Sequence, residues 1–324
     1  MLQEGPLPAE TNESTIRTYV KPQMLEPGFY PSMKRLWHRI SEPIIELCIR
    51  LSGLAVVIFV FLIFLFLLRD SLSLFRHYPV IKFLTGRQWL PISEPPQFGV
   101  IPLLLGSVLV TFWAVVICVP LGVGSAMFIA EVAPKALKNV LKSFVEILAA
   151  IPSVVLGFLG IIWLGPMLRN TFHLPTGMCG LTGSLLLAFM ALPTIISISE
   201  DALTSVPRSY REAAFGLGAT RWQTLWRVIL PSASSGIVAA VMLGIGRVVG
   251  ETMVVLMVTG NAPVIPTSIL QPLRTLTATI AGEMGETVGG SEHYYALFAV
   301  GLVLFAITFT INFIADLFLR RARK

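Results

Sequence analysis

The chain has 324 residues, of which 55% are hydrophobic and only 13% are charged. Its mean hydropathy is +0.78. Soluble globular domains carry about 25% charged residues, so this composition excludes an ordinary water-soluble domain and indicates a protein of the lipid bilayer. The net charge of +6 is not gathered on a basic, aromatic-rich face, which argues against nucleic-acid binding.

The N-terminal part of the chain divides into a polar segment and a first apolar one. Residues 1–33 contain five prolines and no sustained apolar periodicity, which predicts a disordered cytoplasmic tail. Within residues 34–98, Leu51–Leu68 is free of charge and long enough for a transmembrane helix, which needs about 17–25 residues. The rest of that region, from Arg69 to Gln97, forms an outer loop that is long enough for a small folded element.

Residues 99–319 hold five further apolar stretches and are expected to form the transmembrane core. The stretches are Ile101–Ala130, Phe144–Leu164, Leu181–Ser199, Gly236–Val258 and Tyr295–Ala315. Prolines fall inside three of them, which is tolerated because neighbouring helices satisfy the backbone groups that a proline frees. The sequence therefore predicts an all-α membrane protein with six transmembrane helices, followed by a basic cytoplasmic end at residues 320–324.

The distribution of Lys and Arg predicts the orientation in the membrane. Seventeen of the 24 lie before the first span, between the second and third spans, between the fourth and fifth, and after the sixth. Six lie in the remaining loops. Because cytoplasmic loops carry the excess of positive charge, we expect both termini in the cytoplasm.

Sequence motifs give no sign of catalysis. The chain contains no G-x-x-x-x-G-K-[ST], H-E-x-x-H or G-x-S-x-G motif. Its three cysteines, Cys48, Cys118 and Cys179, have neither a disulfide framework nor metal-ligand spacing. We therefore expect a transport subunit and not an enzyme, with no cofactor or metal in this chain.

A cytoplasmic loop at residues 200–231 is expected to begin at Glu200 and Asp201. It contains the sequence "SVPRSYREAAFGLGATRWQTLWRVILP". Residues typical of helix ends predict two short helices with a tight turn between them. They are Pro207 at a first turn, Gly218 after a helix end, Thr220 and Gln223 at capping-box spacing, and Pro231 at the final stop.

Two interpretations of this helical pair follow from the residues alone. Its apolar and aromatic side chains are flanked by arginines. Such a pair could press into a groove on a soluble partner. It could equally lie on the lipid surface, with Trp and Arg at the interface.

The loop resembles the EAA loop of ABC importer permeases, which in that family docks into the ATPase subunit. The matching residues are Glu212, Ala213, Ala214, Gly218, Leu230 and Pro231. The usual pattern has isoleucine where this chain has Val228. The resemblance implies a type I ABC importer permease fold, an ATPase-docking role for these six residues, and ATP and Mg held by the partner ATPase subunits.

Two more stretches look like the phosphate-specific ABC permeases, and more like their C-type subunit. They are "FVEILAAIPSVVLGFLG" (Phe144–Gly160) and "GRVVGETMVVLMVTGN" (Gly246–Asn261). The resemblance implies an ATP-driven importer of inorganic phosphate in a bacterial cytoplasmic (inner) membrane. Its implied partners are a second permease subunit, two ATPase subunits, an external phosphate-binding protein and membrane lipid. Another oxyanion, such as sulfate, molybdate or phosphonate, and an ion-coupled secondary transporter stay open as alternatives.

Arg247 and Glu251 are the only charges within residues 228–273. Residues four apart share a helix face, so we expect the two side chains to meet. A lone charge at the bilayer centre costs roughly 2.5–3.5 kcal/mol, which favours the bundle interior or a water-filled path. In one interpretation the pair is a structural lock, whose charges satisfy each other or partners on a second permease subunit. In the other, Arg247 offers its donors to a tetrahedral oxyanion while Glu251 holds it in place. Gly246 and Gly250 are expected to let another helix approach.

Overall fold

The computed structural model describes residues 31–322. Nearly all of the tail expected at residues 1–33 therefore lies outside the described residues. The chain divides into two compact units, Met1–Leu62 and Ile63–Lys324. Helix α1 (Pro31–Phe75) begins in the first unit and ends in the second. Its apolar span covers Ile45–Phe75, which is longer than the predicted Leu51–Leu68, because the charged residues that bounded the prediction do not stop the helix.

A small folded element follows α1, as the length of the outer loop predicted. It consists of helix α2 (Val80–Thr85) and an antiparallel pair of short strands, β1 (Trp89–Leu90) and β2 (Gln97–Phe98). Trp89 and Phe98 are partners in the strand register and are buried together with Phe83. Apolar burial of these aromatic rings holds the element against α14 (Glu292–Ala322).

Helix α3 (Ile101–Met127) crosses the core and continues as a π-helical segment, η2 (Phe128–Val132). The predicted third span, Phe144–Leu164, is wrong at both ends, because the apolar crossing covers Ser153–Phe172. Pro152 has an extended backbone and separates this crossing from α4 (Lys135–Ala149). The crossing itself comprises α5 (Ser153–Leu159), η3 (Gly160–Leu164) and α6 (Gly165–Phe172).

Helix α7 (Gly180–Thr204) is the most deeply buried of the crossing helices, because 61% of its most apolar 18-residue stretch lies inside the structure. It packs against α3 on one side and α11 (Ser234–Gly250) on the other. The contact with α11 is close at Gly244, where a Cβ atom would lie 2.6 Å from Cγ1 of Ile195. Glycine at this position is therefore required by packing.

The segment before α11 comprises α8 (Arg208–Gly216), α9 (Arg221–Thr224), η4 (Leu225–Ile229) and α10 (Leu230–Ser232). Of these, Arg221–Ser232 and α11 form a bent pair that is long and apolar enough for one span. Pro231 does not end this helical run, because it occupies the first turn of α10. The bend of 70° comes after Ser232, where α11 begins. Within residues 31–322, five helices are long and apolar enough to cross a membrane, or six if this bent pair is one span, in agreement with the predicted six.

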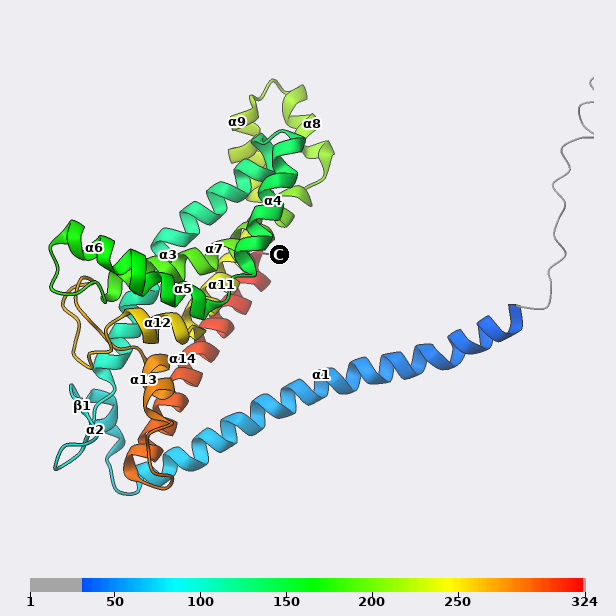
Figure 1. Cartoon of the computed structure of the whole chain (residues 1–324). Helices are drawn as coiled ribbons and strands as arrows, with labels where there is room; N and C mark the ends of the chain where they lie inside the picture. Colours follow the sequence, from blue (N-terminus) through cyan, green and yellow to red (C-terminus); the bar gives the residue numbers. More distant parts are fainter. Residues whose placement is uncertain (1–30, 323–324) are drawn as a thin grey trace, which may run out of the picture. The chain divides into compact units, whose positions relative to one another are not determined.

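The chain continues from α11 through α12 (Met253–Val258) and α13 (Leu276–Glu283) to α14. The predicted fifth span, Gly236–Val258, is not one helix, because α11 ends at Gly250. In the unit Ile63–Lys324, α8 and α9 lie at one end of the bundle and β1 and α2 at the opposite end (Figure 1). We call the end with β1 and α2 the hairpin end.

Candidate functional site

Helix α8 ends in a hydrogen-bonded turn that fixes the direction of the next helix. The N–H of Gly218 donates to the carbonyl of Phe215 at 2.9 Å, and the N–H of Ala219 donates to the carbonyl of Ala214 at 3.0 Å. This pair of bonds defines a Schellman motif, which needs a left-handed residue directly after the helix end. Gly218 supplies it with φ +81°, as the sequence predicted.

Helix α9 begins with the predicted capping box. The side chain of Thr220 accepts a hydrogen bond from the N–H of Gln223 at 3.3 Å. The N–H of Thr220 in turn donates to Oε1 of Gln223 at 2.9 Å. Two backbone groups that would lack partners are satisfied, so the turn between α8 and α9 is fixed from both sides. We call the segment from Pro207 to Ser232 the helical loop.

The helical loop presents large apolar side chains to the outside of the chain. Leu217 is 90% exposed at its tip, and Trp222 and Trp226 are more than half exposed. Exposed apolar side chains gathered in one place mark a surface that binds a partner. Four predicted docking residues, namely Glu212, Ala213, Gly218 and Pro231, are exposed on this loop, whereas Ala214 and Leu230 pack inward.

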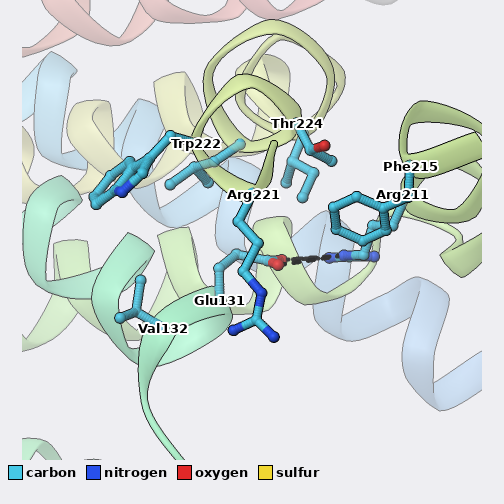
Figure 2. A pocket seen from close by; sticks show the side chains of 9 residues that line it. Glu131, Val132, Arg211, Phe215, Arg221, Trp222 and Thr224 are labelled. Carbon is cyan, nitrogen blue, oxygen red and sulfur yellow. Dashed lines mark hydrogen bonds and ion pairs between the residues drawn. The ribbon is translucent and has the colours of Figure 1, made fainter. Parts of the chain in front are cut away.

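The inward side of the helical loop is packed against the ends of α3 and α7. Leu225 and Ile229 join a buried cluster with Ala126 of α3 and Leu203 of α7. Beside this cluster lies a cavity of about 410 Å³, lined by residues of the loop and by Glu131 of η2 (Figure 2). Glu131 and Arg211 both line this cavity and form an ion pair, with 2.5 Å between Oε1 and Nη2.

A second group of charges lies near the same end of the bundle. Glu200 and Asp201 were expected to begin the cytoplasmic loop, which is wrong, because α7 continues to Thr204. Glu200 is 2% exposed, and its carboxylate pairs with the Nζ atoms of Lys138 and Lys142 on α4, at 2.8 and 2.5 Å. The hydrogen bond that Lys142 donates to Glu200 holds the pKa of Lys142 above its usual value. Asp201 is exposed, and its Oδ1 atom lies 4.0 Å from Nζ of Lys142.

Arg247 and Glu251 do not form the predicted ion pair. Helix α11 ends before Glu251, whose backbone is extended. The Oε1 atom of Glu251 accepts the N–H groups of Met253 and Val254, at 3.0 and 3.2 Å, and so caps α12. Among residues 31–322 no salt bridge joins Arg247 to Glu251, so the prediction that the two charges satisfy each other is wrong. A lock to partners on a second permease subunit stays a prediction.

The guanidinium of Arg247 instead lies on the exposed side of α11. Its Nη1 atom donates to the hydroxyl of Thr194 on α7 at 3.2 Å. Gly246 and Gly250 lie on open surface, since a Cβ atom at either position would meet nothing within 4 Å. The predicted close approach at these glycines is thus not made by the described part of this chain. Arg247 and the two glycines form a surface that is open in the single subunit.

Sequence reasoning missed Glu131, Arg211, Lys138 and Lys142 as parts of the site. The ion-pair partners are far apart in the chain, with 80 positions between Glu131 and Arg211. A usable signal was the position of Glu131, which follows an apolar span of 30 uncharged residues, Ile101–Ala130. An acidic residue directly at a span end requires a cationic partner when the end is packed.

At the hairpin end, one carboxylate connects three separate segments. Glu283 of α13 accepts a hydrogen bond from Nε1 of Trp89 at 3.1 Å and pairs with Arg274 and with Nε2 of His293. These residues border a cavity of about 550 Å³. The segments that carry Trp89, Arg274 and His293 are therefore joined to α13 as one platform by these side-chain bonds.

Comparison with known proteins supports a transport role. Residues 118–324 match the family described as binding-protein-dependent transport system inner membrane component. The phosphate transport system permease protein PstC of Mesorhizobium japonicum is 40% identical over 259 residues, covering 74% of this chain and 78% of that protein. PstC of Pasteurella multocida is 34% identical over 89% of this chain and 95% of its own length. A probable ABC transporter permease, YqgH of Bacillus subtilis, is 43% identical over 71% of this chain and 74% of that protein.

Solved structures agree on the fold. One match is a bacterial alginate ABC transporter, solved in complex with an alginate pentasaccharide-bound periplasmic protein. The match covers 90% of this chain and 99% of that chain, with a TM-score of 0.61 and 19% sequence identity. The inward-facing MetNI methionine ABC transporter covers 71% of this chain and 99% of its own, with a TM-score of 0.55 and 22% identity. The chain is a multi-pass membrane protein and a transport subunit, and it belongs to the family of binding-protein-dependent transport system inner membrane components, the permeases of ABC importers.

Proposed function

We propose that the chain is a permease subunit of an ATP-driven, binding-protein-dependent importer of inorganic phosphate. The observation that carries this proposal is the helical loop, which is capped at both sides of its turn and presents exposed apolar side chains beside the ends of two crossing helices. A rigid exposed helix fits the groove of a soluble partner. The choice of phosphate rests on the relatives named as phosphate permeases.

The helical loop would dock into an ATPase subunit on the cytoplasmic side. The distribution of Lys and Arg supports this orientation, with both termini inside. The docking residues of this chain are Glu212, Ala213, Ala214, Gly218, Leu230 and Pro231. ATP and Mg would be bound by two such ATPase subunits, since the sequence has no P-loop of its own. At the hairpin end, an external phosphate-binding protein would meet the platform around Glu283.

Arg247 is the residue of this chain that would face the substrate path. It is the only cation within residues 228–273, and its guanidinium is exposed and not neutralised by Glu251. A second permease subunit would cover this open side of α11, including the surface at Gly246 and Gly250. The guanidinium fork offers several N–H donors to one tetrahedral oxyanion. Glu251 would act on the path indirectly, by capping α12.

The experiment is uptake of labelled phosphate into liposomes that hold the complete complex with ATP inside. We expect uptake that needs ATP and the binding protein and that survives collapse of the membrane potential. Arg247→Gln should lower uptake strongly while the ATPase stays bound, whereas Lys135→Gln, an exposed residue at the start of α4 and outside the helical loop, controls for loss of positive charge.

Two outcomes would contradict the proposal. Uptake that follows the membrane potential and persists without the ATPase would indicate an ion-coupled secondary transporter. Competition by sulfate, molybdate or phosphonate at phosphate-like concentrations would indicate another oxyanion, because a guanidinium by itself binds any of them.

A further inference from the structure

The guanidinium of Arg211 connects three elements of the chain at one point, and Figure 2 shows its link to Glu131. Its Nη2 and Nε atoms donate to Oε1 of Glu131, at 2.5 and 3.2 Å. Nη2 also donates to the carbonyl of Leu203 at 3.0 Å, and Nη1 donates to the carbonyl of Val206 at 2.6 Å. All three nitrogen atoms of the side chain are therefore engaged.

Two of the three partners of Arg211 lie at the ends of crossing helices, and the third, Val206, lies between α7 and α8. Glu131 lies in η2, which continues α3, and Leu203 lies in the last turn of α7. The last carbonyls of a helix have no partner within the helix and carry partial negative charge, so a cation there is favourable. Arg211 thus fastens α8 to the adjoining ends of α3 and α7, which pack together along the core.

Other contacts between α8 and the bundle are few. In the part of the chain that the structure describes, Ala214 is the only buried residue of α8. The large side chains of Tyr210 and Phe215 are about half exposed. Apolar packing holds the later part of the helical loop through Leu225 and Ile229, but it does little for α8 itself. The charged link of Arg211 is consequently the principal side-chain attachment of α8.

The geometry of this link suits transmission of movement. The Arg211 and Glu131 side chains are only 19% and 18% exposed, so solvent and salt screen their attraction less than at the surface. A guanidinium is planar, and its donors keep fixed angles to one another. A displacement of α8 must therefore either carry η2 and the end of α7 with it or break several charge-assisted bonds together.

We propose that Arg211 is a positioning residue that transmits movement of α8 to α3 and α7 during the transport cycle, with Glu131 as its carboxylate partner. The inference rests on the proposed function, because it assumes that α8 is displaced by an ATPase. It differs from docking, since Arg211 points toward the bundle and not toward the exposed face of the loop.

The test compares three variants of the complete complex in liposomes: Arg211→Gln, Glu131→Gln and Lys135→Gln. Lys135 is the control, because it is an exposed cation at the start of α4, outside the helical loop, and it forms no ion pair among residues 31–322. The readouts are ATPase retained on purification, ATP hydrolysis, and phosphate imported per ATP hydrolysed. The last ratio separates transmission from simple support of the fold.

We expect Lys135→Gln to behave as wild type in all three readouts. Arg211→Gln should retain the ATPase and its hydrolysis but import about tenfold less phosphate per ATP. Glu131→Gln should lower the ratio less, because the bonds from Arg211 to the two carbonyls remain. Arg211→Lys keeps the charge but not the fork, so its ratio should fall between those of Arg211→Gln and wild type.

Wild-type phosphate-to-ATP ratios in both Arg211→Gln and Glu131→Gln would overturn the inference. Loss of bound ATPase in parallel with loss of import would also overturn it, because Arg211 would then serve docking. If Arg211→Gln does not fold, Glu131→Gln and Arg211→Lys decide by the same ratio. Failure of the proposed function looks different, since the wild-type complex would then import no phosphate with ATP.

Discussion

Replacing Gly218 tests whether backbone conformation, and not space, fixes the turn of the helical loop. Gly218 has φ +81°, and a Cβ atom there would meet nothing within 4 Å. Substitution therefore adds no steric clash but forces a side chain into the left-handed region, at about 1–2 kcal/mol for alanine. Asparagine tolerates this region and should cost less, whereas β-branched valine should cost more.

Gly216, two positions earlier, is the matched control, because alanine is expected to stabilise the loop there and not to destabilise it. It is the last residue of α8 and is equally open, with nothing within 4 Å of a Cβ atom. Its backbone is helical, so alanine gains helix propensity there, up to about 1 kcal/mol and less near a helix end. Gly216→Ala should thus leave the loop unchanged or stabilise it slightly.

The assay is hydrogen–deuterium exchange of the purified protein, read at the amide of Ala219, which donates to the carbonyl of Ala214. A destabilisation of about 1.4 kcal/mol increases local opening about tenfold. Exchange should therefore speed up in the order Asn, Ala, Val at position 218. Equal exchange in wild type and Gly218→Ala would refute the reasoning from φ. Equal acceleration by Gly216→Ala would show that side-chain bulk, and not conformation, disturbs the loop.

Three further predictions concern the capping box of α9 and the ion pairs of Glu200 with α4. Thr220→Ala should destabilise α9 by about 1 kcal/mol, seen as faster exchange in its first turn, and Thr220→Ser should restore protection. Glu200→Gln removes the near carboxylate of both Lys138 and Lys142. Because those lysines are 26% and 42% exposed, we expect a loss of about 1–3 kcal/mol in unfolding free energy rather than the larger cost of a fully buried pair. Thermal unfolding measures it, and Asp201→Asn is the comparison, with a change below about 0.5 kcal/mol, because Asp201 is 71% exposed and 4.0 Å from Lys142. The Glu200 carboxylate raises the pKa of Lys142, so this stabilisation is fully present below the ordinary lysine pKa of 10.5 and is lost as pH rises through the higher folded-state value. The difference in unfolding free energy between wild type and Lys142→Met should stay constant from about pH 6 to 9 and shrink at more alkaline pH; a difference that shrinks on acidification would contradict it.

Local signals in the sequence were sufficient where the bonds themselves are local. The Schellman motif at Gly218 and the capping box of Thr220 and Gln223 each close within six residues. Their residue types therefore predicted both the turn and the start of the next helix. The same holds for the number of crossings, because the length of an apolar stretch is a property of the sequence alone.

The prediction for Arg247 and Glu251 failed because it assumed a continuous helix. The carbonyl of Glu251 accepts a hydrogen bond from the hydroxyl of Thr277, which lies 26 positions later in the chain. This distant donor satisfies a backbone group that a continuous helix would have used internally. The two charges are thereby placed in different surroundings, one on the exposed side of α11 and the other at the start of α12.

By itself, the sequence determined a six-span membrane protein with a capped helical loop, because hydropathy and capping act over a few turns. Only the tertiary structure decided which charges meet. Arg211 reaches Glu131 across 80 positions, and Glu200 is buried between two lysines of α4. Side chains this far apart meet only when helices pack, so their pairing depends on the bundle and not on spacing in the chain.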